Sequence, residues 1–335
     1  MKALFLTEGS SQVGFGHVTR CLSLYQALEL FGGDPFFMIK GDNSIGEVLK
    51  GAKYQIFDWI SGWRTIRGIL KNFDLVVLDS YLAGMEIYED ISNLLKTKLY
   101  IDDYLRLEYP AGIVLNGSIY AKELPYPKRQ GLIYLLGIEY IPLRRAFWSV
   151  KPKYYREKLK KILITFGGDD LRNMTPKIIK ALQRAYPHLE LLVVVGGGFK
   201  GVKEIEGLKN SNLRLFYKVD AEGMKSLMLD ADVAISAGGQ TTYELARVGV
   251  PSILVAVAEN QLLNCVSFEK RGIALYAGWW QDENLVEKII QFLELLRDKE
   301  VRERMGKLGR KNLDGKGSIR VADFLKKNTS PPSSP

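Results

Sequence analysis

Two successive series of short apolar runs, separated by amphipathic helical patterns, constrain the fold of this 335-residue chain more than any other feature. The first series opens with ALFLT and the second with KILITFGG, and glycine or polar turns follow many of the runs. Continuous apolar runs, in place of strict alternation, are typical of parallel strands that helices cover on both faces. We predict strands at residues 3–7, 34–40, 75–80, 98–103 and 113–116, and again at 161–168, 189–198, 213–219, 232–239 and 252–258.

The restart of this pattern half-way along the chain predicts two domains. The polar and basic segment RRAFWSVKPKYYREKLK suits an interdomain linker near residues 149–157. We therefore predict an α/β protein with two Rossmann-like, doubly wound domains, at 1–148 and 155–310, and a cleft between them. A last helix at 311–327 is a candidate to cross back to the first domain, and residues 328–335 are expected to form a disordered tail.

The net charge of +9 lies in the second half, because residues 1–150 contain 16 basic and 16 acidic side chains. A basic half could favour a nucleotide's phosphates or an anionic membrane surface, or it could be a solvated helix face. Nucleic acid is not an expected partner, since no recognised binding module is evident. No apolar run is long enough for a membrane span, and two distant cysteines without metal-ligand spacing favour a reduced, cytoplasmic chain.

Gly14, Gly16 and His17 follow the first predicted strand, where ligands of open α/β sheets collect. The glycines permit a tight turn, and the next helix directs free N–H groups at a ligand. Thr19 replaces the third glycine of the dinucleotide fingerprint, so a nicotinamide cofactor is disfavoured. At the positive helix end His17 is predicted to stay neutral and act as a base, unless it only caps or packs. Arg20 could orient an anionic group or form a surface ion pair.

Polar turns also follow the strands of the second series. Backbone N–H groups and hydroxyls at a helix start suit a diphosphate, and a carboxylate one turn later could accept both ribose hydroxyls. A plain capping arrangement of threonine with glutamate is the alternative. The candidate nucleotide-binding residues are Gly167, Gly168, Gly238, Gly239, Gln240, Thr241, Thr242 and Glu244. The candidate residues for the other part of the substrate are Gly14, Gly16, Arg20, Asp79, Tyr81, Asn260 and Gln261.

Seven segments occur in a fixed order along nearly the whole chain: GFGHVTRCLSL, VVLDSY, YIDDY, LLGIEYIPLRRAFW, ILITFGGDD, SAGGQTTYELARVGVPSI and AENQ. They resemble the nucleotide-sugar hydrolase family of pseudaminic acid biosynthesis with its spore-coat polysaccharide relatives. More distantly, they resemble the lipid-linked N-acetylglucosaminyltransferases of peptidoglycan synthesis. The resemblance implies the GT-B fold and hydrolysis of UDP-2,4-diacetamido-2,4,6-trideoxy-β-L-altropyranose to UDP and the free sugar, with inversion at C1.

The resemblance also implies residue roles. His17 would activate water at the anomeric carbon, Glu244 would hold the ribose, and Gln240 to Thr242 would hold the diphosphate. Tyr81 and Asn260 match positions near the sugar. It implies no metal and no other cofactor, a UDP-sugar as the partner, and at most weak contact with a membrane surface. We expect a monomer or a weak dimer.

Two other functions stay open. An inverting glycosyltransferase of the same fold needs the same base and diphosphate cradle, and differs in its nucleophile. With a lipid acceptor it should expose an apolar and basic patch on the first domain, for which the loop FDWISGW (57–63) is short. A non-catalytic nucleotide-sugar sensor would bind UDP without turnover, and the intact glycine–histidine motif argues against it.

Overall fold

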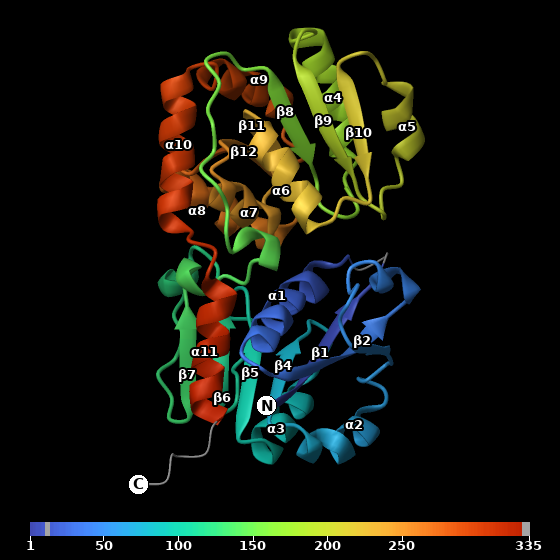
Figure 1. Cartoon of the computed structure of the whole chain (residues 1–335), viewed down its shortest axis with the longest axis vertical. Coiled ribbons are helices and arrows are strands. Elements are labelled where there is room, and N and C mark those ends of the chain that lie inside the picture. Colours follow the sequence, from blue (N-terminus) through green and yellow to red (C-terminus); the bar gives the residue numbers. More distant parts are fainter. Residues whose placement is uncertain (11–13, 330–335) are drawn as a thin grey trace. The chain divides into compact units, whose positions relative to one another are not determined.

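The computed structural model describes residues 1–10 and 14–329, and the chain divides into two units (Figure 1). The first unit comprises Met1–Arg145 together with the segment from Gly315 onward, and the second comprises Ala146–Asp314. Each unit contains one sheet and its own hydrophobic core. The central strands are buried along nearly their whole length because helices cover the sheets, as continuous apolar runs predict.

The first unit has a seven-stranded sheet in the order β3-β2-β1-β4-β5-β6-β7, and all of its strand pairs are parallel. The strands are β1 (Lys2–Gly9), β2 (Asp34–Gly41), β3 (Tyr54–Ile56), β4 (Leu75–Asp79), β5 (Thr97–Ile101), β6 (Gly112–Asn116) and β7 (Leu132–Leu136). The helices are α1 (Gly16–Leu30), α2 (Trp63–Ile69), α3 (Met85–Leu94) and α11 (Gly317–Thr329). Although it ends the described chain, α11 packs against α1.

The second unit has a six-stranded parallel sheet in the order β10-β9-β8-β11-β12-β13. The strands are β8 (Lys161–Thr165), β9 (Glu190–Val195), β10 (Leu213–Tyr217), β11 (Val233–Ala237), β12 (Ser252–Ala256) and β13 (Ala274–Trp279). The helices are α4 (Met174–Ala185), α5 (Val202–Gly207), α6 (Ala221–Asp230), α7 (Thr241–Val248), α8 (Leu262–Lys270), α9 (Leu285–Leu295) and α10 (Lys299–Asn312).

The predicted fold class is confirmed, and each of the ten predicted strands is present. Three strands were missed: β3, β7 and β13. All three lie at sheet edges, where a strand has a neighbour on one side only and its residues are incompletely buried. Edge strands need no continuous apolar run, so their sequence signal is weaker.

The passage from the first unit to the second comes earlier than the linker we predicted at 149–157. Lys153 is buried and donates to the carbonyl oxygen of Met228 at 3.0 Å, and the Tyr155 hydroxyl donates to Gly249 O at 2.9 Å. These residues are therefore anchored to the second unit. At the other end α10 reaches Asn312, and the last helix runs to Thr329 instead of 327. The rest of the predicted tail lies outside the described residues.

The strand order reverses between β1 and β4 in the first sheet and between β8 and β11 in the second. Open α/β sheets bind ligands at the carboxyl ends of strands at such a switch point. The turn after β1 leads to His17, and β4 ends at Asp79. In the second sheet β8 leads to Gly167 and β11 leads to Gly238. The topology thus places the two strongest sequence motifs at the two switch points.

Candidate functional site

His17 and Asp79 form a hydrogen-bonded pair at the switch point of the first sheet. His17 lies in the first turn of α1, and its Nδ1 is 2.7 Å from Oδ1 of Asp79, the last residue of β4. Asp79 is fully buried, whereas the His17 side chain is 14% exposed. A carboxylate accepts only, so in the neutral ring Nδ1 carries the proton and Nε2 is left as the proton acceptor.

The predicted charge tendency of His17 is wrong in direction. The helix N-terminus was expected to keep the ring neutral, but the pKa of His17 is raised above its usual value. Burial by itself lowers this pKa, and the negative charge and hydrogen bond of Asp79 outweigh it, with a smaller contribution from Glu8. A helix end carries only a partial charge, so a full carboxylate in contact dominates. The raised pKa makes the ring a stronger base.

Arg20 contacts this pair and forms hydrogen bonds with two carboxylates of the protein. Its Nε and Nη2 donate to the two oxygens of Asp79 at 2.5 and 2.6 Å, and Nη1 donates to Asp103. Burial raises the pKa of Asp79, but the charges of Arg20 and His17 lower it well below its usual range. We predicted Arg20 and Asp79 as substrate contacts. Their polar atoms bond to one another, to His17 and to Asp103, and their contact with substrate stays a prediction.

Tyr81 is the predicted substrate residue that lies beside His17 and remains accessible. Its ring meets the His17 ring edge-on, with centroids 4.5 Å apart, and the residue is 36% exposed. Its hydroxyl donates to Asp103, and its backbone N–H donates to Oε1 of Glu8 at 2.6 Å. The sequence analysis overlooked Glu8 as a member of this cluster, although its place directly after the first predicted strand was an available signal. Asp103 belongs to the YIDDY segment, an acidic turn after a predicted strand that the sequence offers as either a substrate contact or a helix cap.

Glu8 is 2% exposed, and its Oε2 has no hydrogen-bond partner among the described residues. Of the two glycines in the turn, Gly14 needs its residue type because its φ is +88°. Gly16 is exposed, and a Cβ there would meet no heavy atom of the described chain within 4 Å. Backbone geometry thus requires glycine at the first position, whereas Gly16 leaves open space next to His17.

In the second unit, Gln261 holds the glycine turn after β11. This residue directly precedes α8. The N–H of Gly238 donates to Gln261 Oε1 at 3.2 Å, and Val257 N–H donates to the same oxygen at 3.1 Å. We predicted Gln261 as a substrate contact, but its carbonyl oxygen binds backbone N–H groups of two neighbouring turns. Its amide nitrogen lies on the side of Gly239. Asn260, in contrast, is exposed in the same short segment.

The start of α7 combines buried and accessible residues. Thr242 and Glu244 are 1% and 2% exposed, and Thr242 Oγ1 donates to the carbonyl oxygen of Ala237 at 3.2 Å. Gln240 and Thr241 are half-buried. The N–H groups of Thr242 and Tyr243 donate to the carbonyl oxygens of Gly239 and Gln240, each at 3.1 Å, so the start of α7 is tied to the glycine turn.

The glycine pair after β8 is exposed and leads to a capped helix. Gly167 has a φ of +77°, which favours glycine, and Gly168 O accepts from the N–H of Gly198 at 2.8 Å. Asp170 accepts from the N–H groups of Met174 and Thr175 at 2.9 and 2.8 Å, so it caps α4. The two glycines stay the predicted ligand contacts here.

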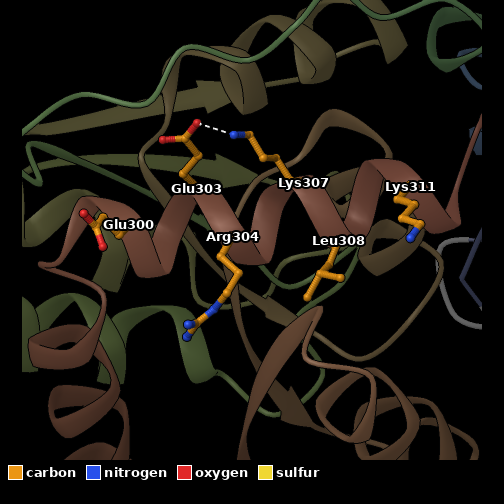
Figure 2. A pocket seen from close by; sticks show the side chains of 6 residues that line it. All are labelled: Glu300, Glu303, Arg304, Lys307, Leu308 and Lys311. Atoms are coloured by element: carbon orange, nitrogen blue, oxygen red, sulfur yellow. Dashed lines mark ion pairs between the residues drawn. The ribbon is translucent and has the colours of Figure 1, made fainter.

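Part of the basic excess of the second half lies on α10, where two arginines serve packing. Figure 2 shows a shallow hollow along α10, lined by side chains of that one helix, including a Glu303–Lys307 ion pair of 2.7 Å. Arg302 is fully buried, and Arg310 donates to the carbonyl oxygens of Val150 and Lys151. This surface has mixed charge and belongs to neither switch point.

Among residues 1–10 and 14–329, no group of three His, Cys, Asp or Glu side chains is arranged to hold a metal ion. Within the same described residues, no helix is both long and apolar enough to cross a bilayer.

The sequence profile of the glycosyltransferase family 28 C-terminal domain matches residues 162–314, which is most of the second unit. Along the whole chain, the structure of MurG from Acinetobacter baumannii superimposes with a TM-score of 0.72, at 16% identity over 98% of this chain and 100% of that one. The chain has the GT-B fold. Its second domain matches the family 28 C-terminal domain, and its curated relatives are 25–26% identical to it.

Two curated relatives resemble this chain along most of its length. The spore coat polysaccharide biosynthesis protein SpsG of Bacillus subtilis is 26% identical over 95% of this chain and 96% of its own. The UDP-2,4-diacetamido-2,4,6-trideoxy-beta-L-altropyranose hydrolase of Campylobacter jejuni is 25% identical over 81% of this chain and 97% of its own. These relatives confirm the predicted resemblance to the hydrolase and spore-coat proteins.

A Helicobacter pylori protein named as both pseudaminic acid cytidylyltransferase and the same hydrolase is 25% identical over 80% of this chain but 46% of its own. The chain thus spans about half the length of two of the curated relatives that it matches. It spans nearly the full length of two others.

Proposed function

We propose that this GT-B enzyme is a hydrolase that cleaves UDP-2,4-diacetamido-2,4,6-trideoxy-β-L-altropyranose to UDP and the free sugar, for surface polysaccharide biosynthesis of the pseudaminic acid type. The observation that carries the proposal is the His17–Asp79 pair, 2.7 Å apart, at the switch point of the first sheet. Two relatives whose names state this hydrolysis support the choice of substrate.

In the proposed reaction His17 Nε2 accepts a proton from water while the water oxygen forms a bond to C1 of the sugar. The C1–O bond to the diphosphate breaks, UDP leaves with the electron pair, and the configuration at C1 inverts. Asp79 holds the ring through Nδ1 and stabilises the imidazolium that forms, as the carboxylate of a catalytic triad does. Tyr81, exposed beside the ring, is assigned to the sugar.

The nucleotide is assigned to the second unit. Helix N-termini favour phosphate through the positive end of the helix dipole, so we assign the diphosphate to Gln240 to Thr242, at the start of α7 after the turn at Gly239. Gly167 and Gly168 offer a second exposed backbone segment at the same switch point. Glu244 is assigned to the ribose. No metal enters this scheme, since helix N-termini can stabilise the departing diphosphate.

An inverting glycosyltransferase is the second candidate, favoured by the family 28 domain at residues 162–314. For such an enzyme with a lipid acceptor, the loop 57–63 was the candidate apolar patch. Its Trp59 is fully buried and donates from Nε1 to the Thr7 carbonyl oxygen at 2.8 Å. Trp63 Nε1 donates to Asp90 at 2.8 Å. Both indoles are tied within the unit, which favours water as the nucleophile.

The deciding experiment follows UDP release from the diacetamido-altrose nucleotide without any acceptor, while proton NMR follows the anomeric signal of the sugar. We expect turnover with inversion in the unaltered protein and a loss of about 10²–10⁴-fold in His17→Ala, the usual worth of a positioned general base. His188→Ala is the matched control, because His188 is the chain's other histidine and lies exposed in the second unit. UDP binding, seen as a raised Tm, without acceptor-free turnover would favour the transferase.

A further inference from the structure

We propose that Asp103 is a positioning residue that couples Tyr81 to the His17–Asp79 pair. This inference deepens the proposed function and rests on His17 as its base. Asp103 follows β5, and its two carboxylate oxygens are divided between two partners: one accepts from Arg20 Nη1 and the other from the Tyr81 hydroxyl. Arg20 also binds Asp79, and the Tyr81 ring contacts His17. The interactions therefore form a closed network around His17, which we call the circuit.

The backbone that carries Asp103 is fixed from two directions. The side-chain amide of Asn116, at the end of β6, donates to the Asp103 carbonyl oxygen at 2.7 Å. The carboxylate of Asp102 accepts from the N–H groups of Leu105 and Arg106 at 2.8 and 3.1 Å. Leu105 has a φ of +61°, a left-handed conformation that costs a non-glycine residue free energy. A strained turn held this firmly is typical of segments that position functional groups.

The contact with Asp103 restrains the Tyr81 side chain, which is otherwise weakly held. Tyr81 is 36% exposed, so packing alone does not hold its ring edge-on against His17. Its backbone is held by Glu8, and Arg106 lies 5.5 Å from the ring centroid, whereas its hydroxyl is held by Asp103. Without Asp103 the ring would be free to rotate away from the base, because a single χ1 change moves an exposed ring.

The circuit also sets the charge around His17. The charged or titratable groups that surround the ring are Asp79 from β4, Arg20 from α1, Glu8 from β1 and Tyr81 from the turn after β4. Arg20 now divides its positive charge between two carboxylates. If Asp103 is neutralised, Arg20 is compensated by Asp79 alone, and the imidazolium of His17 becomes less favourable.

The test uses the fact that the chain has only two histidines, so proton NMR of the intact protein should give two ring titrations, with His188 as the internal reference. In Asp103→Asn we expect the His17 midpoint to move down by about half a pH unit or more, a modest share of what a close charge does. Asp90→Asn is the matched control, because Asp90 likewise accepts from an aromatic side chain, Trp63, and pairs with an arginine, Arg67. It should leave the midpoint unchanged.

Catalysis supplies the second readout. Asp103→Asn and Tyr81→Phe should each lower kcat/KM about ten-fold, and the double variant should be no slower than Asp103→Asn, because that variant already breaks the Tyr81–Asp103 contact. Asp103→Glu should recover part of the loss. An unmoved His17 midpoint, or additive losses in the double variant, would overturn the proposal. The titration needs no substrate, so it tests the coupling separately from hydrolysis. A His17 midpoint that moves in Asp103→Asn, in a protein that does not hydrolyse the nucleotide sugar, would refute the proposed function but support the role of Asp103.

Discussion

At the scale of single residues, Asp79 decides the chemistry that His17 can perform. An imidazole becomes an effective base when one nitrogen is held and the other is free, and Asp79 holds Nδ1 from a fully buried position. Arg20 keeps that carboxylate ionised, because its guanidinium contacts both oxygens. The cluster therefore joins an imidazole, the carboxylate that orients it and the cation that keeps the carboxylate charged.

The pH dependence of kcat/KM tests this arrangement. The base must be neutral, and the pKa of His17 is raised, so activity should increase with pH through a midpoint above the ordinary value of 6.5. In Asp79→Asn the midpoint should move to lower pH, because the charge that favours the imidazolium is gone. The plateau should fall by about 10²–10⁴-fold as the ring loses its orientation.

Steady-state rates from pH 5 to 9 would measure both changes, and thermal unfolding of each variant would show whether the fold persists. A midpoint that stays in place in Asp79→Asn, with the plateau intact, would contradict the role of Asp79. Retained UDP binding in the same variant would confine the defect to the first unit.

At the scale of elements, the turn between β11 and α7 depends on one close approach. A Cβ at Gly238 would lie 2.2 Å from Cys265 Sγ, whereas a Cβ at Gly239 would meet only Gln261 Nε2 at an ordinary 3.8 Å. The two neighbouring glycines therefore have different tasks: the first permits α8 to pack on the turn, and the second keeps the turn open. Both have the same sequence environment, so only the packing distinguishes them.

Gly238→Ala should consequently lower the free energy of unfolding by about 1–3 kcal/mol, the usual cost of overpacking. Gly239→Ala should change it by less than about 1 kcal/mol, because the added methyl group meets only an ordinary contact. Urea unfolding of the two variants would compare them directly. Combining Gly238→Ala with Cys265→Ala should recover part of the loss, and equal effects of the two alanines would show that the Cys265 contact does not matter.

At the scale of the whole molecule, the first unit is discontinuous in sequence. Residues 1–145 make its sheet, and the segment from Gly315 adds α11, which packs against α1 (Figure 1). Val321, Ala322 and Leu325 of α11 are buried. Helix α1, whose second residue is His17, thus packs against α11, the last described helix.

Deleting residues 315–335 should therefore destabilise the first unit selectively. Each buried aliphatic side chain is worth about 1.5–3 kcal/mol, so the loss would be several kcal/mol and would reach α1 and His17. UDP binding should persist, since the proposed nucleotide residues lie in the second unit. Calorimetry with and without UDP would separate the two effects.

Deleting only residues 330–335 is the control for that truncation and should change neither transition. Loss of UDP binding together with hydrolysis in the longer truncation would mean that the two units do not unfold independently, and would contradict the assignment of α11 to the first unit alone.

The amino-acid sequence by itself determined the architecture and the location of the candidate motifs. Apolar runs and helical periodicity are local properties, so ten strands and the two Rossmann-like sheets could be predicted. The Gly14–His17 turn and the Gly238–Thr242 turn could be located too, because ligands collect after the strands of such sheets.

Only the tertiary structure decided what the individual side chains do. Asp79 lies 62 residues from His17 in sequence, and Gln261 lies 23 residues from Gly238, so neither contact follows from spacing. The parallel order β1–β4 brings Asp79 to the histidine and reverses the charge tendency expected from the helix end. Packing likewise gave Arg20 and Gln261, both predicted ligand contacts, hydrogen-bond partners within the protein. Charge and hydrogen-bond partners depend on distances in space, which no local pattern contains.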